Sequence, residues 1–152
     1  MKEPERIASL FKDLYNGQPW LDVTITGTLA SISAGQAAKK TAPWNSIWEI
    51  VNHLVSWRLE VLERVKGIHT QTPADNYFRP VADTSPAAWQ HTLASFEDTQ
   101  QRWLSFLESM NEQDLEKSYA PTSLTYYQHL HGILQHDAYH LGQIALLAKL
   151  PG

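Results

Sequence analysis

Cysteine is absent from this chain of 152 residues. Its absence excludes disulfide bonds, thiolate metal ligands and a cysteine nucleophile. A transition-metal site therefore has only histidine, aspartate, glutamate and water available as ligands. The apolar content of 43% and the aromatic content of 11% are those of a folded globule, so a disordered chain is not expected.

Long apolar runs are absent as well. No stretch is long enough to cross a bilayer, and the charged first residues, Met1 to Arg6, lack the apolar core of a secretion signal. We therefore expect a cytoplasmic protein without membrane contact.

Positive charge is sparse. The chain has 12 Lys and Arg residues against 16 Asp and Glu residues, a formal net charge of −4, and Lys39-Lys40 is its largest basic cluster. Proteins that bind nucleic acid normally present a basic face, so DNA and RNA are not expected as partners. The length fits one core, and no repeat or low-complexity linker divides the chain. We therefore expect a single domain over residues 1–152.

Apolar residues recur at helical spacing in four long segments, namely 5–15, 45–66, 86–109 and 126–150. Ser46 and Glu49 are spaced as a capping box, and Ser85-Pro86 is an N-cap followed by proline in the first turn. Residues 68–84 are predicted to be a loop, and a short turn is expected near 111–115. A helical bundle is the natural way to bury four such faces, so the predicted fold class is all-α.

The segment between the first two long helices is ambiguous. Val23 to Thr26 is rich in β-branched residues, which favours a strand, whereas Ile25, Leu29 and Ile32 fit a helix. No second run of this kind is present as a pairing partner, so we expect a helix within 20–32. A capping-box spacing then predicts a short helix over 33–38.

His136 and His140 are four residues apart in the last predicted helix. This spacing places both imidazoles on one face, about one turn apart, where they can bind one divalent metal ion. The helix is apolar over a wide arc, so both rings are expected to be buried and to need polar partners. A metal ion is one such partner; a carbonyl, a carboxylate or water is another.

His53 lies at the inner edge of the apolar stripe of the helix predicted at 45–66. It is the only histidine outside the last helix that lies clearly on the inward face of a long helix. Because bundles commonly hold metals between facing helices, His53 is the candidate third ligand. Periodicity alone does not show that His53 faces the other two.

Two residues adjacent to these histidines have both a structural and a functional interpretation. Glu49 can orient His53 or act as a base, but its place in the capping box favours a structural role. Gln143 is close to His140 on the helical wheel, so it can bond that ring or a ligand; helix packing is the simpler interpretation.

Other polar and aromatic residues have weaker claims to a functional role. Asp137 lies 100° around the helix from His136, which predicts a ligand-supporting or surface position. His129 lies roughly 10 Å from His136 along the axis; it can line the pocket, although a hydrogen-bonded histidine at the bundle end is favoured. Three histidines are expected to be solvated: His69, His91 and His131. Six tryptophans are expected to be mostly in the core, with one or two at the pocket wall: Trp20, Trp44, Trp48, Trp57, Trp89 and Trp103.

Two segments resemble motifs of the DinB/YfiT-like proteins. Ser46 to Leu54, SIWEIVNHL, is similar to their second-helix motif. Gly132 to Ile144, GILQHDAYHLGQI, is similar to their last-helix motif, His-x-x-Tyr-His-x-Gly-Gln-Ile. The turn from Gly17 to Trp20 and the loop before Trp44 also fit one branch of the family, so the resemblance covers nearly the whole chain.

The resemblance implies an up-down-down-up four-helix bundle, often a homodimer. It also implies a divalent metal bound by three histidines, which correspond here to His53, His136 and His140. Some similar proteins are S-transferases for low-molecular-weight thiols or related isomerases. Others are described only as candidate metal-dependent hydrolases, and many have no assigned activity.

Three neutral imidazoles would leave a divalent ion its full charge and at least one open coordination position, the pattern of catalytic sites. Such an ion can acidify water or hold a thiol as thiolate, so the ligands do not choose between hydrolysis and thiol transfer. Zinc and nickel are the leading candidates. We expect an enzyme that acts on a small molecule, with a low-molecular-weight thiol as a candidate co-substrate. The alternative is a non-catalytic bundle whose metal braces the core or binds a ligand.

Overall fold

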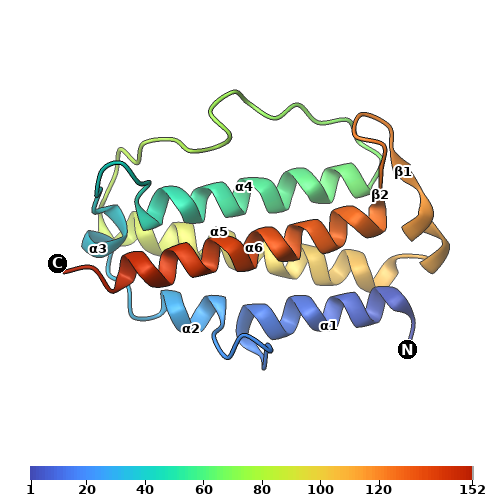
Figure 1. Ribbon diagram of the computed structural model, residues 1–152, viewed down its shortest axis with the longest axis horizontal. Helices are drawn as coiled ribbons and strands as arrows, with labels where there is room; N and C mark the ends of the chain where they lie inside the picture. The colour runs from blue at the N-terminus through green and yellow to red at the C-terminus, as the bar shows by residue number, and fades with distance from the viewer. Residues whose placement is uncertain (152) are drawn as a thin grey trace.

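Four long helices form the bundle in a computed structural model, which describes residues 1–151. They are α1 (Glu3–Asn16), α4 (Ile47–Val65), α5 (Pro86–Ser109) and α6 (Tyr126–Ala148). α1 and α6 run in one direction and α4 and α5 in the other (Figure 1). The all-α class and the up-down-down-up order are therefore confirmed.

The neighbours in the bundle follow from this order. α4 packs against α6 and α5, and α1 packs against α5 and α6. Because α4 and α5 are parallel, the chain must return along the full bundle between them. Residues 66–85 make this return along the outer side of α4 (Figure 1). The connection predicted at 68–84 is thus placed beside the helix that carries His53.

Side-chain caps begin the long helices where the sequence predicted them. The Ser46 hydroxyl accepts a hydrogen bond from the Glu49 amide at 3.1 Å, and the Glu49 carboxylate accepts one from the Ser46 amide at 2.7 Å. Ser85 caps α5 in the same sense through the Ala88 amide at 3.2 Å. Gly67, with φ of 83°, supplies the left-handed residue that follows α4.

The short elements differ in part from the prediction. They are α2 (Ile25–Leu29), α3 (Ala34–Ala38), the 3-10 helix η1 (Glu112–Glu116), β1 (Ser118–Tyr119) and β2 (Leu124–Thr125). Only five residues of the predicted helix within 20–32 are helical, and the Thr24 side chain caps the start of this helix. The antiparallel pair β1–β2, with Tyr119 opposite Leu124, was not predicted.

The core consists of two apolar clusters with a buried ion pair at their junction. Trp48 and Trp89 belong to one cluster and Trp103 to the other. Arg58 packs against aromatic rings of both clusters, including Phe11. The expectation that the tryptophans are mostly core is wrong for Trp20, which is 98% exposed, and for Trp44, 56% exposed. No helix within residues 1–151 has the length and apolar character needed to span a membrane.

Candidate metal centre

α4 and α6 bring His53, His136 and His140 together. The ring centroids are 4.9 Å apart for His53 and His136, 4.7 Å for His53 and His140, and 4.5 Å for His136 and His140. One ring nitrogen from each lies within 4.8 Å of the others. His53 and His140 are buried and His136 is half-buried. The predicted approach of His53 to the pair on the last helix is therefore present.

The hydrogen bonds of two rings fix their tautomers. The Nδ1 of His53 is 2.6 Å from the backbone oxygen of Asn76, and the Nδ1 of His140 is 2.7 Å from the Oε1 of Gln143. Both oxygens can only accept, so each Nδ1 carries the proton and each neutral ring keeps a lone pair on Nε2. A partner on the far nitrogen is also what orients histidines that bind metals.

Burial keeps the three rings neutral. Loss of solvation and, to a smaller extent, repulsion from His140 and His53 lower the pKa of His136 to about 3. Burial also lowers the pKa of His53 and of His140, although the Asn76 carbonyl and Gln143 respectively oppose that shift. Neutral imidazole is the form that binds metal ions, so these rings need to lose no proton on metal binding at neutral pH.

The donor set fits a divalent cation. The Nε2 atoms of His53 and His136 face each other at 2.9 Å, and the buried Nδ1 of His136 has no hydrogen-bond partner among residues 1–151. Because Nδ1 of His53 carries the proton of that ring, the two Nε2 atoms can lie this close only if His136 donates a proton from Nε2 or a cation lies between them. Two nitrogens at about 2.0–2.1 Å from a tetrahedral zinc ion are roughly 3.3 Å apart. The Nε2 atoms of His53 and His136 are therefore close to the separation that a shared ion requires, and a nitrogen of His140 lies within 4.8 Å of the other two ligand atoms.

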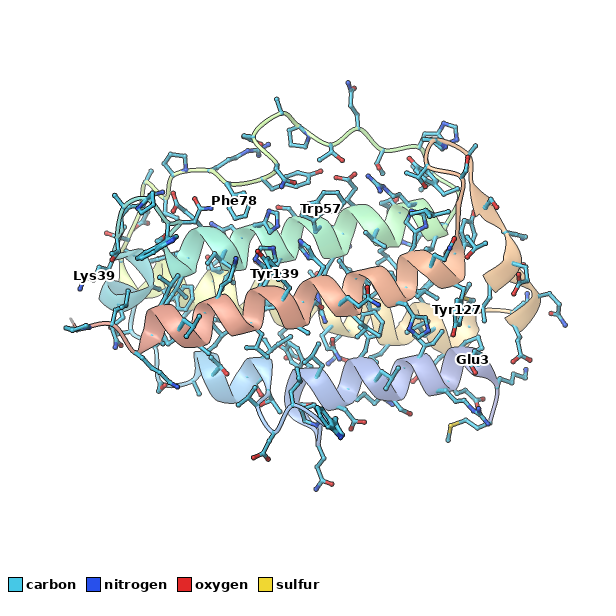
Figure 2. The ribbon with its side chains drawn as sticks, viewed as in Figure 1. Glu3, Lys39, Trp57, Phe78, Tyr127 and Tyr139 are labelled. Carbon is cyan, nitrogen blue, oxygen red and sulfur yellow. The ribbon has the colours of Figure 1, made fainter. Side chains whose placement is uncertain are left out.

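Aromatic side chains enclose the three histidines. Phe78 stacks on His53 with centroids 3.9 Å apart and planes within 10°, and Trp57 packs against His136 at 5.9 Å. Tyr139 lies against His140 at 5.0 Å. Figure 2 shows Trp57 and Phe78 beside α4 and Tyr139 on α6. Together with the histidines they line a groove of about 480 Å³ that continues along both helices toward the β1–β2 hairpin.

Residues 22–144 match the family model of the DinB superfamily. The chain belongs to the DinB superfamily. The matched residues contain all three histidines and exclude the whole of α1. Comparison with curated proteins gives no match, and comparison with solved structures gives none.

The return loop supplies part of the site in this DinB-superfamily protein. Asn76 accepts the hydrogen bond of His53 through its backbone and that of the Trp57 indole through its side chain, at 2.9 Å. Asn76 and Tyr77 both adopt left-handed backbone conformations, with φ of 51° and 64°. Each such residue costs of order 1–3 kcal/mol and persists only where its surroundings hold it. No periodic pattern could predict this contribution, because loop conformation does not repeat.

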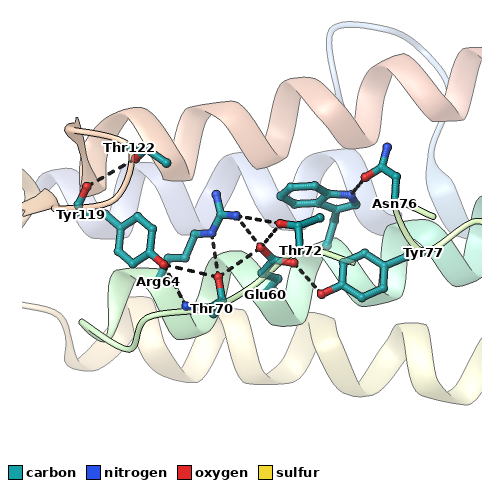
Figure 3. Close-up of polar contacts among 9 residues, drawn as sticks. Glu60, Arg64, Thr70, Thr72, Asn76, Tyr77, Tyr119 and Thr122 are labelled. Atoms are coloured by element: carbon teal, nitrogen blue, oxygen red, sulfur yellow. Dashed lines mark hydrogen bonds and ion pairs between the residues drawn. The ribbon is translucent and has the colours of Figure 1, made fainter. Parts of the chain in front are cut away.

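Glu60 holds this loop in place. Its buried carboxylate accepts hydrogen bonds from Tyr77 at 2.5 Å, Thr72 at 2.6 Å and Thr70 at 3.1 Å, and pairs with Arg64 (Figure 3). Burial alone would raise the pKa of Glu60, but the bonds from Thr72, Tyr77 and Arg64 lower it below its ordinary value. The carboxylate is thus an ionised anchor, two turns along α4 from His53.

Replacement of Glu60 by glutamine is expected to weaken metal binding about 10- to 100-fold without loss of the helices. An amide has one acceptor oxygen instead of two, so Tyr77 or the threonines lose their partner and the backbone that orients His53 is released. Isothermal titration with zinc measures the affinity, and circular dichroism measures the helix content. Glu63→Gln is the matched control, because Glu63 forms an exposed pair with Lys66. Unchanged affinity in Glu60→Gln would contradict the anchoring role.

Other residues singled out from the sequence have mixed outcomes. Glu49 caps α4 and pairs with Lys40 at 2.7 Å, which confirms the structural interpretation. Gln143 bonds His140, the functional alternative of the two. His129 lines the groove and donates its Nδ1–H to the Thr125 carbonyl at 2.9 Å, so it combines both interpretations.

The prediction for Asp137 is wrong. Its side chain is completely buried and pairs with Arg58 at 2.8 Å on the side of α6 that faces the bundle interior. Among the histidines expected to be solvated, His69 and His91 are exposed, but His131 is half-buried against Tyr127. Arg58 itself was missed, because a charged residue in an apolar helix does not reveal that its partner lies on another helix.

Proposed function

We propose that this protein is a metal-dependent enzyme that acts on a small molecule at a divalent ion bound by His53, His136 and His140. The observation that carries the proposal is the convergence of three neutral imidazole nitrogens in a buried site at the end of a groove. Three protein ligands leave a coordination position for water or substrate, as in catalytic rather than structural sites. Nickel and zinc suit an all-imidazole donor set.

Residues around the three histidines would orient the ligands and limit the access of water. Asn76 and Gln143 hold two of the rings with their Nε2 lone pairs toward the site. Phe78 and Trp57 restrict water around the rings, which strengthens electrostatic interactions there. When bound, the ion would supply an electrophilic centre that either acidifies water or stabilises a thiolate.

Thiol transfer is favoured over hydrolysis by the lining of the groove. No aspartate or glutamate lines it within the described part of the chain, so a carboxylate general base for the attack of water is lacking. A thiol needs only to release its proton to solvent. The thiolate sulfur would then form a bond to an electrophilic carbon of the second substrate, and the leaving group would depart with its electron pair. The co-substrate is accordingly a low-molecular-weight thiol.

Metal analysis and an assay of thiol transfer test this proposal together. Protein purified without a His-tag and incubated with nickel or zinc should retain close to one equivalent of metal. The loaded protein should consume a thiol and an electrophile faster than the metal-free protein does. Less than about a tenth of an equivalent of metal would contradict the site. Full metal content with no turnover on a broad panel would favour the non-catalytic alternative, in which the ion braces the bundle.

We also propose that residues 1–152 act as one domain and that two copies associate through the face of α6. Asp137 is the only Asp, Glu, Lys or Arg in α6, and it is buried. The outer face instead exposes Tyr139 and Leu146, and a hollow of about 470 Å³ next to Leu146 is walled by the exposed Trp44. Exposed apolar surface of this kind marks protein interfaces. Sedimentation as a monomer at micromolar concentration would contradict the dimer.

A further inference from the structure

The groove has a second polar end, distinct from the three histidines. His129 lies seven residues before His136 on α6, which corresponds to about 10 Å along the helix axis. Arg64 of α4 lines the same groove. Gly132 lies between the two ends, and a side chain there would meet no atom within 4 Å, so the path along α6 is open.

Arg64 presents one unused donor at this end. Its Nε donates to Thr70 at 3.1 Å, and its Nη2 bonds Thr72 and Glu60, whereas its Nη1 makes no hydrogen bond to residues 1–151. In Figure 3 the guanidinium extends from α4 toward α6. The guanidinium carbon of Arg64 lies over the rings of Trp57 and Tyr119, 5.3 Å from the centroid of each. The side chain is therefore fixed before any ligand arrives.

His129 supplies a second unused nitrogen. The residue is 6% exposed, and its Nδ1 donates to the Thr125 carbonyl, which leaves Nε2 buried without a partner among residues 1–151. Its ring packs edge-on against Tyr119 at 5.5 Å, the same ring that holds Arg64. A buried imidazole nitrogen without a partner is unfavourable, and a polar group of a ligand would satisfy it.

We propose that Arg64 and His129 bind a carboxylate of the substrate while its reacting group occupies the metal end of the groove. This inference rests on the proposed function. Arg64 is the only charged residue among those that line the groove, and a bound divalent ion would add further positive charge. Arg64 Nη1 would donate to one carboxylate oxygen. Because Nδ1 of His129 already donates to Thr125, a proton taken up together with the ligand would lie between Nε2 of His129 and the other carboxylate oxygen. Such charge-assisted bonds favour a carboxylate over a hydroxyl.

The substrate class is therefore a thiol that carries a carboxylate roughly 10 Å from its sulfur. Three probes test it on the nickel-loaded protein: 8-mercaptooctanoate, the alcohol 8-mercaptooctanol, and 3-mercaptopropionate, which is too short to reach both ends. Binding is followed by the thiolate-to-nickel charge-transfer absorption. The long acid should bind about tenfold more tightly than the alcohol of equal length and more tightly than the short acid.

Variants separate the two ends. His129→Phe keeps a ring against Tyr119 but removes the nitrogen, and Arg64→Gln removes the charge. Each should reduce the preference for acid over alcohol to less than about threefold. His129→Phe should keep its metal content, and Arg64→Gln is compared at saturating nickel because Arg64 also pairs with Glu60. Equal dissociation constants for acid and alcohol in the wild-type protein would overturn the carboxylate subsite alone. Absence of the absorption band with every probe would overturn the proposed function as well.

Discussion

Replacing His136 by alanine is expected to lower the affinity for nickel or zinc by at least about 100-fold and to leave the bundle folded. The loss of one of three ligands should exceed the 10- to 100-fold effects typical of residues that only support a ligand. The fold should persist because His136 contributes little to it. Its pKa of about 3 reflects an unfavourable burial, and its Nδ1 has no partner within residues 1–151. Titration with each metal and thermal unfolding of the metal-free protein measure the two effects.

His131→Ala is the matched control for this variant. His131 lies on the same helix and is also half-buried, but it packs against Tyr127 and not against the three histidines. It should bind metal as the wild-type protein does. If removal of metal by a chelator unfolded the wild-type protein outright, the ion would be a structural brace and the separation of metal binding from folding would be wrong.

The sequence was sufficient for the helices because their signals are local. The bounds of α5 agree with the prediction at both ends, since Ser85-Pro86 begins the helix and the apolar spacing ends at Ser109. The capping boxes of α3 and α4 were likewise predicted from residues three positions apart. The hairpin β1–β2 was missed because each strand has only two residues, too few for an alternating pattern to show.

Periodicity predicted the candidate site only where one helix determines it, whereas the assignment of His53 came from its inward position and from the resemblance to the DinB/YfiT-like proteins. His136 and His140 share a face because the helical repeat places them there. The approach of His53 depends on which helices are neighbours, and periodicity does not specify this. The position of Trp20 was mispredicted for the same reason. Its hydrophobicity suggested burial, but whether another element covers it depends on the tertiary fold, and Trp20 is exposed.

The contacts that the loop of residues 66–85 makes with His53 depend on residues still further apart in the sequence. Glu60 accepts hydrogen bonds from hydroxyl groups 10 to 17 positions further along the chain. These bonds hold the loop against α4, so that Asn76 and Phe78 contact His53. No spacing rule connects a helical carboxylate with scattered Thr and Tyr residues of a loop. One consequence is that the geometry of His53 depends on a polar anchor outside the apolar core, so metal affinity and global stability should respond to different substitutions.

The buried pair of Arg58 and Asp137 is expected to give the largest change in stability. Burial raises the pKa of the Asp137 carboxyl and the Arg58 guanidinium opposes that rise, so each group depends on the other for compensation. Asp137→Asn would leave a guanidinium in the core without a counter-charge. We expect a loss of about 3–5 kcal/mol in the free energy of unfolding. For a chain of this length, that corresponds to a fall in Tm of roughly 10 °C.

Two comparisons isolate the effect of burial. Asp98→Asn makes the same chemical change in an exposed pair with Arg102 on α5 and should alter stability by less than about 1 kcal/mol. The double variant Arg58→Met with Asp137→Leu removes both charges and should recover most of the loss, because no uncompensated charge remains in the core. A double variant as unstable as the single one would show that the hydrogen bonds of Arg58 to Thr99 and Gln100, and not the charge of Asp137, hold the centre of the bundle together.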